Sequence, residues 1–159
     1  MAGKRYLEDM SVGQVFEHGA IEVTEAEILD FARKFDPQIF HLDREAAKET
    51  FFRGLAASGW HTAAMTMRLF VDSGFDLAGG IIGAGGSLTW PRPVRPGDVL
   101  SLRIEVLELR PSRSKPDRGM VKARLTTLDA SGQAVQVMTA DLLALRRNSG
   151  VAAPPTGAA

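Results

Sequence analysis

The segment between Ser58 and Val71 constrains this chain most, because it is apolar nearly all the way round a helix. Arg68 is its only formally charged residue. Six apolar side chains recur on one helical face: Trp60, Ala63, Ala64, Met67, Phe70 and Val71. A helix that is apolar on most of its sides is normally buried. The rest of the chain must therefore surround this helix, and we expect the six side chains to face the core.

Several other stretches alternate between apolar and polar residues. Leu100–Val106 and Val121–Leu125 alternate strictly, which is typical of half-buried strands. A turn at Asp129–Gly132 leads into a further strand over Gln133–Leu145, and Gln14–Val23 predicts an opening strand. Helices early and strands late predict an α+β protein with an antiparallel sheet. One buried helix and several long strands can satisfy each other only if the sheet wraps around the helix, which is the hot-dog arrangement.

A glycine-rich stretch, Gly79–Gly86, follows the apolar helix. It lacks both the GxGxxG spacing and the following helix of a mononucleotide-binding loop. We interpret it as a strand whose glycines allow close backbone packing.

Asp36 occupies a position that local helix chemistry does not explain. A capping box at residues 24–27 starts a helix, whose apolar spacing continues as far as Phe35. Pro37 disfavours helical backbone at the preceding residue, so Asp36 lies just past the helix C-terminus. A negative charge is unfavourable there because of the helix dipole. Asp36 is therefore a candidate for function, whereas Asp43 is explained as the N-cap of a short following helix.

Composition bounds the class of protein. The chain has 159 residues, 45% of them hydrophobic, and its 19 basic residues balance 19 acidic ones. We expect a single domain over residues 1–147 and a disordered Gly/Ala/Pro-rich tail over 148–159. Cysteine is absent, which excludes disulfides and thiol catalysis.

Charge and hydropathy also limit the partners that we expect. The basic stretch between Arg110 and Arg124 has no interleaved aromatic residues, and we interpret it as a solvated edge rather than a nucleic-acid site. The N-terminus carries charges where a signal peptide has an apolar core, and no apolar run approaches the roughly 18 residues of a membrane span. We therefore expect a cytoplasmic protein that binds neither membrane nor nucleic acid.

Three residues match the groups that hydration of a conjugated double bond requires: a carboxylate at Asp36, an imidazole at His41, and Gly59 at the start of the apolar helix. This reaction needs a base for the water proton, an acid to protonate carbon, and donors for the enolate oxygen. The first helical turn has unpaired N–H groups and a partial positive charge, and a glycine lets a carbonyl approach them. Taken alone, an Asp and a His as close in sequence as Asp36 and His41 are most often a structural hydrogen-bonded pair in a loop, and Gly59 could serve close packing.

The chain resembles the MaoC-like dehydratases, a family that includes (R)-specific enoyl-CoA hydratases, over roughly Val12–Arg147. The resemblance rests first on an Asp followed five residues later by His, at Asp36 and His41. It also rests on Gly59 at the start of the central helix and on the turn Pro93–Asp98. The family usually shows Asp-x-Asn-Pro-x-His, whereas here proline directly follows the Asp and glutamine stands where asparagine is usual.

The resemblance implies that Asp36 and His41 hold one water molecule and act as general base and acid. The reaction would be a syn addition to a 2-enoyl thioester, with acyl-CoA as the substrate, or the reverse dehydration of the 3-hydroxyacyl thioester. The Gly59 N–H would bind the thioester oxygen. Ser58 is expected to cap the helix and, as a functional residue, to shape the oxyanion site. No metal or redox cofactor is expected.

The resemblance also implies a homodimer or a dimer of dimers. A sheet wrapped around one helix leaves an open edge, which hot-dog proteins of this kind pair across a two-fold axis.

Two other functions remain open from the sequence. A hot-dog acyl-CoA thioesterase would share the fold and the thioester substrate, but such enzymes carry a catalytic Asp or Glu on or beside the buried helix, and residues 58–71 contain neither. A non-catalytic acyl-CoA-binding protein would result if the segment between Asp36 and His41 had lost its water.

The remaining candidates have simpler interpretations. Asp36, His41, Asp43 and His61 are suitable metal ligands by type, but no helical His-x-x-x-His spacing supports a metal site. We interpret His61 as bonded to a loop carbonyl and His18 as a surface residue. Three large aromatic residues could line an acyl pocket, but we interpret them as core residues: Phe40, Trp60 and Trp90.

Overall fold

The computed structural model describes residues 3–147 of the chain. Its elements follow in the order η1 (Leu7–Asp9), β1 (Val15–Glu22), α1 (Glu25–Phe35), α2 (Ile39–Leu42), η2 (Ala46–Glu49), α3 (Gly59–Asp72), β2 (Ile82–Thr89), β3 (Val99–Pro111), β4 (Arg118–Leu128) and β5 (Ala134–Leu145). The tail over 148–159, for which we expected disorder, lies outside the described residues. Within residues 3–147, no helix has the length and apolar character needed to cross a membrane.

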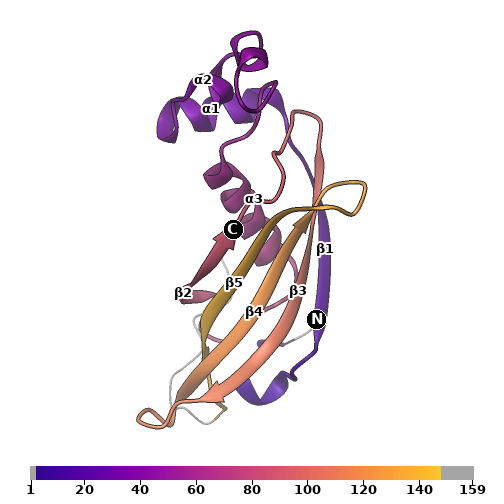
Figure 1. Ribbon diagram of the computed structural model, residues 1–159. Helices are drawn as coiled ribbons and strands as arrows, with labels where there is room; N and C mark the ends of the chain where they lie inside the picture. The colour runs from indigo at the N-terminus through magenta and orange to yellow at the C-terminus, as the bar shows by residue number, and fades with distance from the viewer. Residues whose placement is uncertain (1–2, 148–159) are drawn as a thin grey trace.

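The strands form one antiparallel five-stranded sheet in the order β1-β3-β4-β5-β2. The long strands β3, β4 and β5 lie side by side in its middle, and β1 and β2 form its edges (Figure 1). Side chains of β3 and β4 alternate between buried and less buried positions, as their sequence patterns predicted. Gly86 of β2 approaches β5 so closely that a Cβ there would lie 2.1 Å from the carbonyl oxygen of Thr139. The glycine-rich stretch therefore contains a closely packed strand, as predicted.

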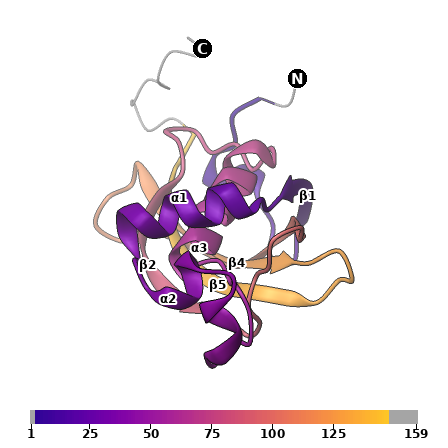
Figure 2. The same ribbon diagram turned by 90° about the horizontal axis from the view of Figure 1, so that it is seen from above.

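Helix α3 lies against one face of this curved sheet and contacts β1 and β3 (Figures 1 and 2). Its buried side chains join apolar side chains from the long strands, including Leu102, Ile104, Val121 and Leu125, in one hydrophobic core. The predicted α+β hot-dog arrangement is confirmed.

The face that α3 turns to the core differs from the predicted one. Six of its side chains are buried: His61, Thr62, Met65, Thr66, Leu69 and Phe70. Trp60, Met67 and Val71 were predicted to be buried but are 62%, 43% and 58% exposed. The reason is that the Thr66 hydroxyl bonds to the Thr62 carbonyl at 2.9 Å and lies 2.6 Å from the Thr127 hydroxyl of β4, so a partly polar face can be buried. The exposed residues Trp60, Ala64, Met67 and Val71 form what we call the α3 stripe.

Helix α1 begins and ends where the sequence predicted. The N–H of Glu27 donates to the Thr24 hydroxyl, and the N–H of Thr24 donates to the Glu27 carboxylate, both at 3.2 Å. Phe35 is the last helical residue. The N–H of Asp36 still donates to the Ala32 carbonyl at 2.9 Å, so Asp36 is held by the last turn of the helix.

The segment after α1 contains two short helices rather than the single one predicted. Helix α2 precedes Asp43 and the 3-10 helix η2 follows it. The Asp43 carboxylate accepts the N–H groups of Glu45 and Ala46 at 2.9 and 3.0 Å, as a capping side chain does, but Asp43 is the C-cap of α2, and the N-cap position of η2 falls on Glu45. Helices α1 and α2 lie together beyond one end of the sheet, beside the start of α3 (Figure 1).

Candidate active site

Helix α2 and the loop after η2 hold His41 in one orientation. The His41 side chain is buried, and its Nδ1 lies 2.6 Å from the carbonyl oxygen of Ala56. Because a carbonyl can only accept, Nδ1 carries the hydrogen, which leaves Nε2 to exchange protons. Ala56 is itself fixed, since its N–H donates to the Phe40 carbonyl at 3.1 Å.

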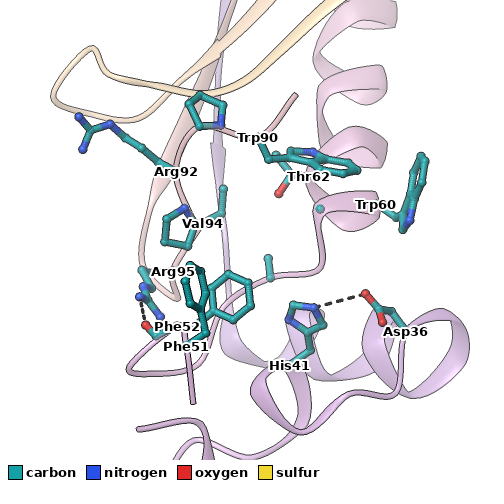
Figure 3. A pocket seen from close by; sticks show the side chains of 14 residues that line it. Asp36, His41, Phe51, Phe52, Trp60, Thr62, Trp90, Arg92, Val94 and Arg95 are labelled. Atoms are coloured by element: carbon teal, nitrogen blue, oxygen red, sulfur yellow. Dashed lines mark hydrogen bonds and ion pairs between the residues drawn. The ribbon is translucent and has the colours of Figure 1, made fainter. Parts of the chain in front are cut away.

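Asp36 faces this imidazole across a short gap. Its Oδ2 lies 3.3 Å from Nε2 of His41, and the two side chains point toward one another (Figure 3). The same oxygen accepts the Ser58 hydroxyl at 2.7 Å, while Oδ1 accepts the Gln38 side-chain amide at 2.6 Å. Each carboxylate oxygen has two lone pairs, so capacity remains for a water molecule.

The surroundings of Asp36 favour its ionised form. Burial alone would raise the pKa of the Asp36 carboxyl, but the hydrogen bonds from Ser58 and Gln38, together with attraction to His41 when that imidazole is protonated, outweigh it and hold the pKa below its usual value. Asp36 is therefore a carboxylate, ready to accept a proton, over the neutral range of pH.

Gln38 departs from the usual family pattern but supports the site. Its N–H donates to the Asp36 carbonyl at 2.8 Å, and its own carbonyl accepts the His41 N–H at 2.9 Å. These bonds close a compact connection between α1 and α2. His41 consequently lies within α2 rather than in an extended loop, and Asp36 is the C-cap of α1.

Ser58 joins the start of α3 to the acid–base pair. Its hydroxyl accepts the Trp60 N–H at 3.3 Å and donates to Asp36 at 2.7 Å. The predicted N-cap role is confirmed. The additional contact with Asp36, 22 positions earlier in the chain, was not predicted.

Gly59 lines the same cavity as Asp36 and His41, at the first position of α3. Its N–H finds no hydrogen-bond acceptor among the described residues. A Cβ at this position would lie between 2.7 and 2.9 Å from three ring atoms of Trp90. Close packing against Trp90 is therefore enough to require glycine here, and its N–H is in addition free to bind a ligand oxygen.

The cavity between these groups has a volume of about 640 Å³. Aromatic residues make up much of its wall: Phe51, Phe52, Trp60 and Trp90 (Figure 3). The turn from Pro91 to Arg95 closes one side. Arg95 braces this turn, because its guanidinium donates to the carbonyls of Gly54 and Leu55 at 2.8 and 3.1 Å and also to that of Phe52.

Sequence reasoning missed part of this wall. Trp60 and Trp90 were interpreted as core residues, but both line the cavity and are 62% and 41% exposed. Thr62 also lines the cavity from the end of the first turn of α3, and the bracing role of Arg95 was not predicted. The turn Pro93–Asp98, which the family pattern highlights, was the available indication that this region belongs to the site.

The other histidines lie outside the cavity. His61 packs on Phe31 with ring centroids 4.9 Å apart, and its buried Nδ1 has no partner among the described residues, so the predicted bond to a loop carbonyl is wrong. Burial lowers the pKa of His61, although Glu27 partly opposes this. His18 is half-buried on β1. No group of three or more potential ligands in residues 3–147 is arranged to hold a metal ion.

Comparison with known proteins places this geometry in a family. A family model described as the MaoC like domain matches residues 9–128. The 3-hydroxybutyryl-CoA dehydratase of Methylorubrum extorquens is 31% identical over 112 residues, which cover 69% of each chain. The crystal structure of the MaoC-like dehydratase from Rhodospirillum rubrum is 53% identical, with a TM-score of 0.87 over 90% of this chain and 98% of that one. The unliganded R-hydratase PhaJ1 from Pseudomonas aeruginosa is 25% identical, with a TM-score of 0.68 over 97% and 96%. The chain belongs to the family of MaoC-like dehydratases.

Proposed function

We propose that the protein adds water to a 2-enoyl thioester, with acyl-CoA as the thioester, or removes water from the matching 3-hydroxyacyl thioester. One observation carries the proposal: the Asp36 carboxylate and His41 Nε2 lie 3.3 Å apart in a cavity that Gly59, at the start of α3, also lines. The names of the Methylorubrum dehydratase and the Pseudomonas R-hydratase support this class of reaction.

Asp36 and His41 divide the proton transfers between them. A water molecule held by both groups loses a proton to the Asp36 carboxylate as its oxygen bonds to C3 of the substrate. The C2=C3 π bond breaks, and C2 takes a proton from protonated Nε2 of His41. Proton transfer from Asp36 to His41 then restores both groups, and the 3.3 Å separation of their atoms suits this step. No redox change occurs.

Gly59 supplies the stabilisation of the developing negative charge. As electrons move from the double bond toward the carbonyl, the thioester oxygen becomes an enolate. The first turn of α3 offers that oxygen the unpaired Gly59 N–H together with the positive end of the helix dipole. An N–H fixed in advance costs no reorganisation when the charge forms.

The same arrangement argues against a thioesterase that uses a carboxylate on the buried helix. The only carboxylate on α3 is Asp72, at the opposite end of the helix from Gly59, where it pairs with Arg68 at 2.7 Å. It does not line the cavity of Asp36 and His41. The described helix thus offers no carboxylate to activate water against the thioester carbonyl.

Incubation with crotonyl-CoA tests the proposal against both alternatives. A hydratase removes the enoyl absorbance without releasing thiol, and this is the expected result. Release of free CoA thiol would instead identify a thioesterase. Saturable binding of crotonyl-CoA with neither change would identify a non-catalytic acyl-CoA-binding protein.

A further inference from the structure

Trp90 forms a rigid wall of the cavity beside the start of α3. Its ring lies so close to Gly59 that no Cβ fits between them. It also packs edge-on against Trp60, with ring centroids 5.3 Å apart at an interplanar angle of 82°. Its Nε1–H donates to the Gln136 side-chain oxygen at 2.9 Å. The indole is therefore held on three sides and cannot swing aside without breaking these contacts.

A closed polar cluster lies behind this wall. The Gln136 amide donates to the Thr66 hydroxyl at 3.0 Å, and that hydroxyl lies 2.6 Å from the hydroxyl of Thr127. Gln136 and Thr127 have no exposed surface, and Thr66 is 1% exposed. Moving Trp90 would leave the buried oxygen of Gln136 without its donor, which is costly in such a site. An alkyl chain would gain little in return from these polar neighbours.

We propose that Trp90 limits the acyl-chain length and restricts the enzyme to short acyl thioesters such as crotonyl-CoA. This inference rests on the proposed function for the position of the substrate. With its thioester oxygen at the Gly59 N–H, the acyl group reacts directly in front of the indole. A longer linear chain meets the ring and, behind it, the polar cluster of Gln136, Thr66 and Thr127.

The test compares the ratio of kcat/KM for crotonyl-CoA to kcat/KM for trans-2-octenoyl-CoA in three proteins. The wild type should prefer crotonyl-CoA. Trp90→Ala should shift the ratio toward octenoyl-CoA by at least about tenfold, the gain expected if two of its four additional methylene groups become buried. Phe35→Ala is the control, because Phe35 is an aromatic residue that is 71% exposed and does not line this cavity. That control should leave the ratio within about threefold of wild type, because the Phe35 ring does not contact the acyl chain in this arrangement.

A binding measurement separates failure of this inference from failure of the proposed function. Butyryl-CoA and octanoyl-CoA cannot be hydrated, so calorimetric titration with both measures how Trp90 affects the binding of a short and a longer acyl chain in the absence of turnover. If the wild type binds butyryl-CoA more tightly than octanoyl-CoA, and Trp90→Ala reverses or abolishes this preference, the result supports Trp90 as the limit on acyl-chain length even if no enoyl-CoA is hydrated. Equal binding of both by the wild type, or an unchanged preference in Trp90→Ala, overturns it. If Trp90→Ala does not unfold cooperatively, Trp90→Leu replaces it under the same criteria.

Discussion

Ser58 should matter to both stability and activity, because its hydroxyl serves two partners at once. It caps α3 through the Trp60 N–H and donates to the Asp36 carboxylate at 2.7 Å. Ser58→Ala removes both interactions, whereas Ser58→Gly removes the bond to Asp36 but largely preserves the cap, since glycine is tolerated at N-cap positions. The pair of variants therefore separates the two roles.

The magnitudes follow from the type of each bond. Loss of an N-cap costs about 1 kcal/mol, and loss of a hydrogen bond to a charged group costs about 1.5 to 3 kcal/mol. We expect Ser58→Ala to be less stable than Ser58→Gly by roughly the cap contribution in urea unfolding. Both should lose about ten- to a hundredfold in kcat/KM for crotonyl-CoA, because both release the oriented carboxylate.

The pH dependence gives a sharper test of the same contact. Although burial raises the pKa of Asp36, the hydrogen bond from Ser58 helps hold it below its usual value. Such a group adds stability that is present above its unfolded pKa and is lost as pH falls through the folded pKa. Either substitution should raise the pKa of Asp36, shifting the acid limb of the pH profile of kcat/KM to higher pH. The stability deficit should shrink at acidic pH. An unmoved acid limb with near wild-type kcat/KM in both variants would refute the reasoning.

Three further predictions follow. The open edge of β2 and the exposed α3 stripe predict a dimer or larger assembly. Light scattering should give a mass that is a multiple of the 17.2 kDa chain mass, and Met67→Asp should lower the measured mass. A monomeric wild type would contradict this prediction. Gly59→Ala should lower the melting temperature, because its Cβ clashes with the Trp90 ring. This decrease should largely disappear when Gly59→Ala is made in Trp90→Ala. Strictly additive decreases from the two substitutions would mean that the clash is not the cause. Because Gly59 fixes the carbonyl, the water held by Asp36 and His41 and the proton on His41 should reach the same face of the C2=C3 double bond, so addition should be syn. By family resemblance the product should be (R)-3-hydroxybutyryl-CoA, and chiral analysis showing mainly the (S) product would exclude this orientation.

Local chemistry made much of the fold predictable. The capping box of α1, the alternating strands and the apolar stretch of α3 each depend on residues close together in the sequence. The buried face of α3 was not predictable in this way. Thr66 is buried because it meets Thr127, 61 positions later, and single-sequence periodicity cannot reveal such a partner.

The candidate site was also predictable only where it depends on residues that are close together in the sequence. Asp36, His41 and Gly59 were identified from short-range spacing and family resemblance, and the structure brings them to one cavity. The contacts that orient them are long-range: His41 depends on the Ala56 carbonyl, 15 positions away. Trp90 is fixed by a glutamine 46 positions away, which is why its place in the cavity wall was not predicted. Whether Asp36, His41 and Gly59 perform the chemistry stays a prediction.

The acid–base pair is tested most directly by hydration of crotonyl-CoA with Asp36→Asn and His41→Asn, each beside a matched control. An asparagine amide can replace the Nδ1–H that bonds to Ala56, so His41→Asn should fold while lacking Nε2. Asp30→Asn and His18→Ala change the same residue types outside the cavity and should retain activity. We expect both site variants to unfold cooperatively and to lose essentially all hydration. The assignment would be contradicted if either variant kept more than about a tenth of the wild-type rate, because the activation free energy would then have risen by less than ~1.4 kcal/mol.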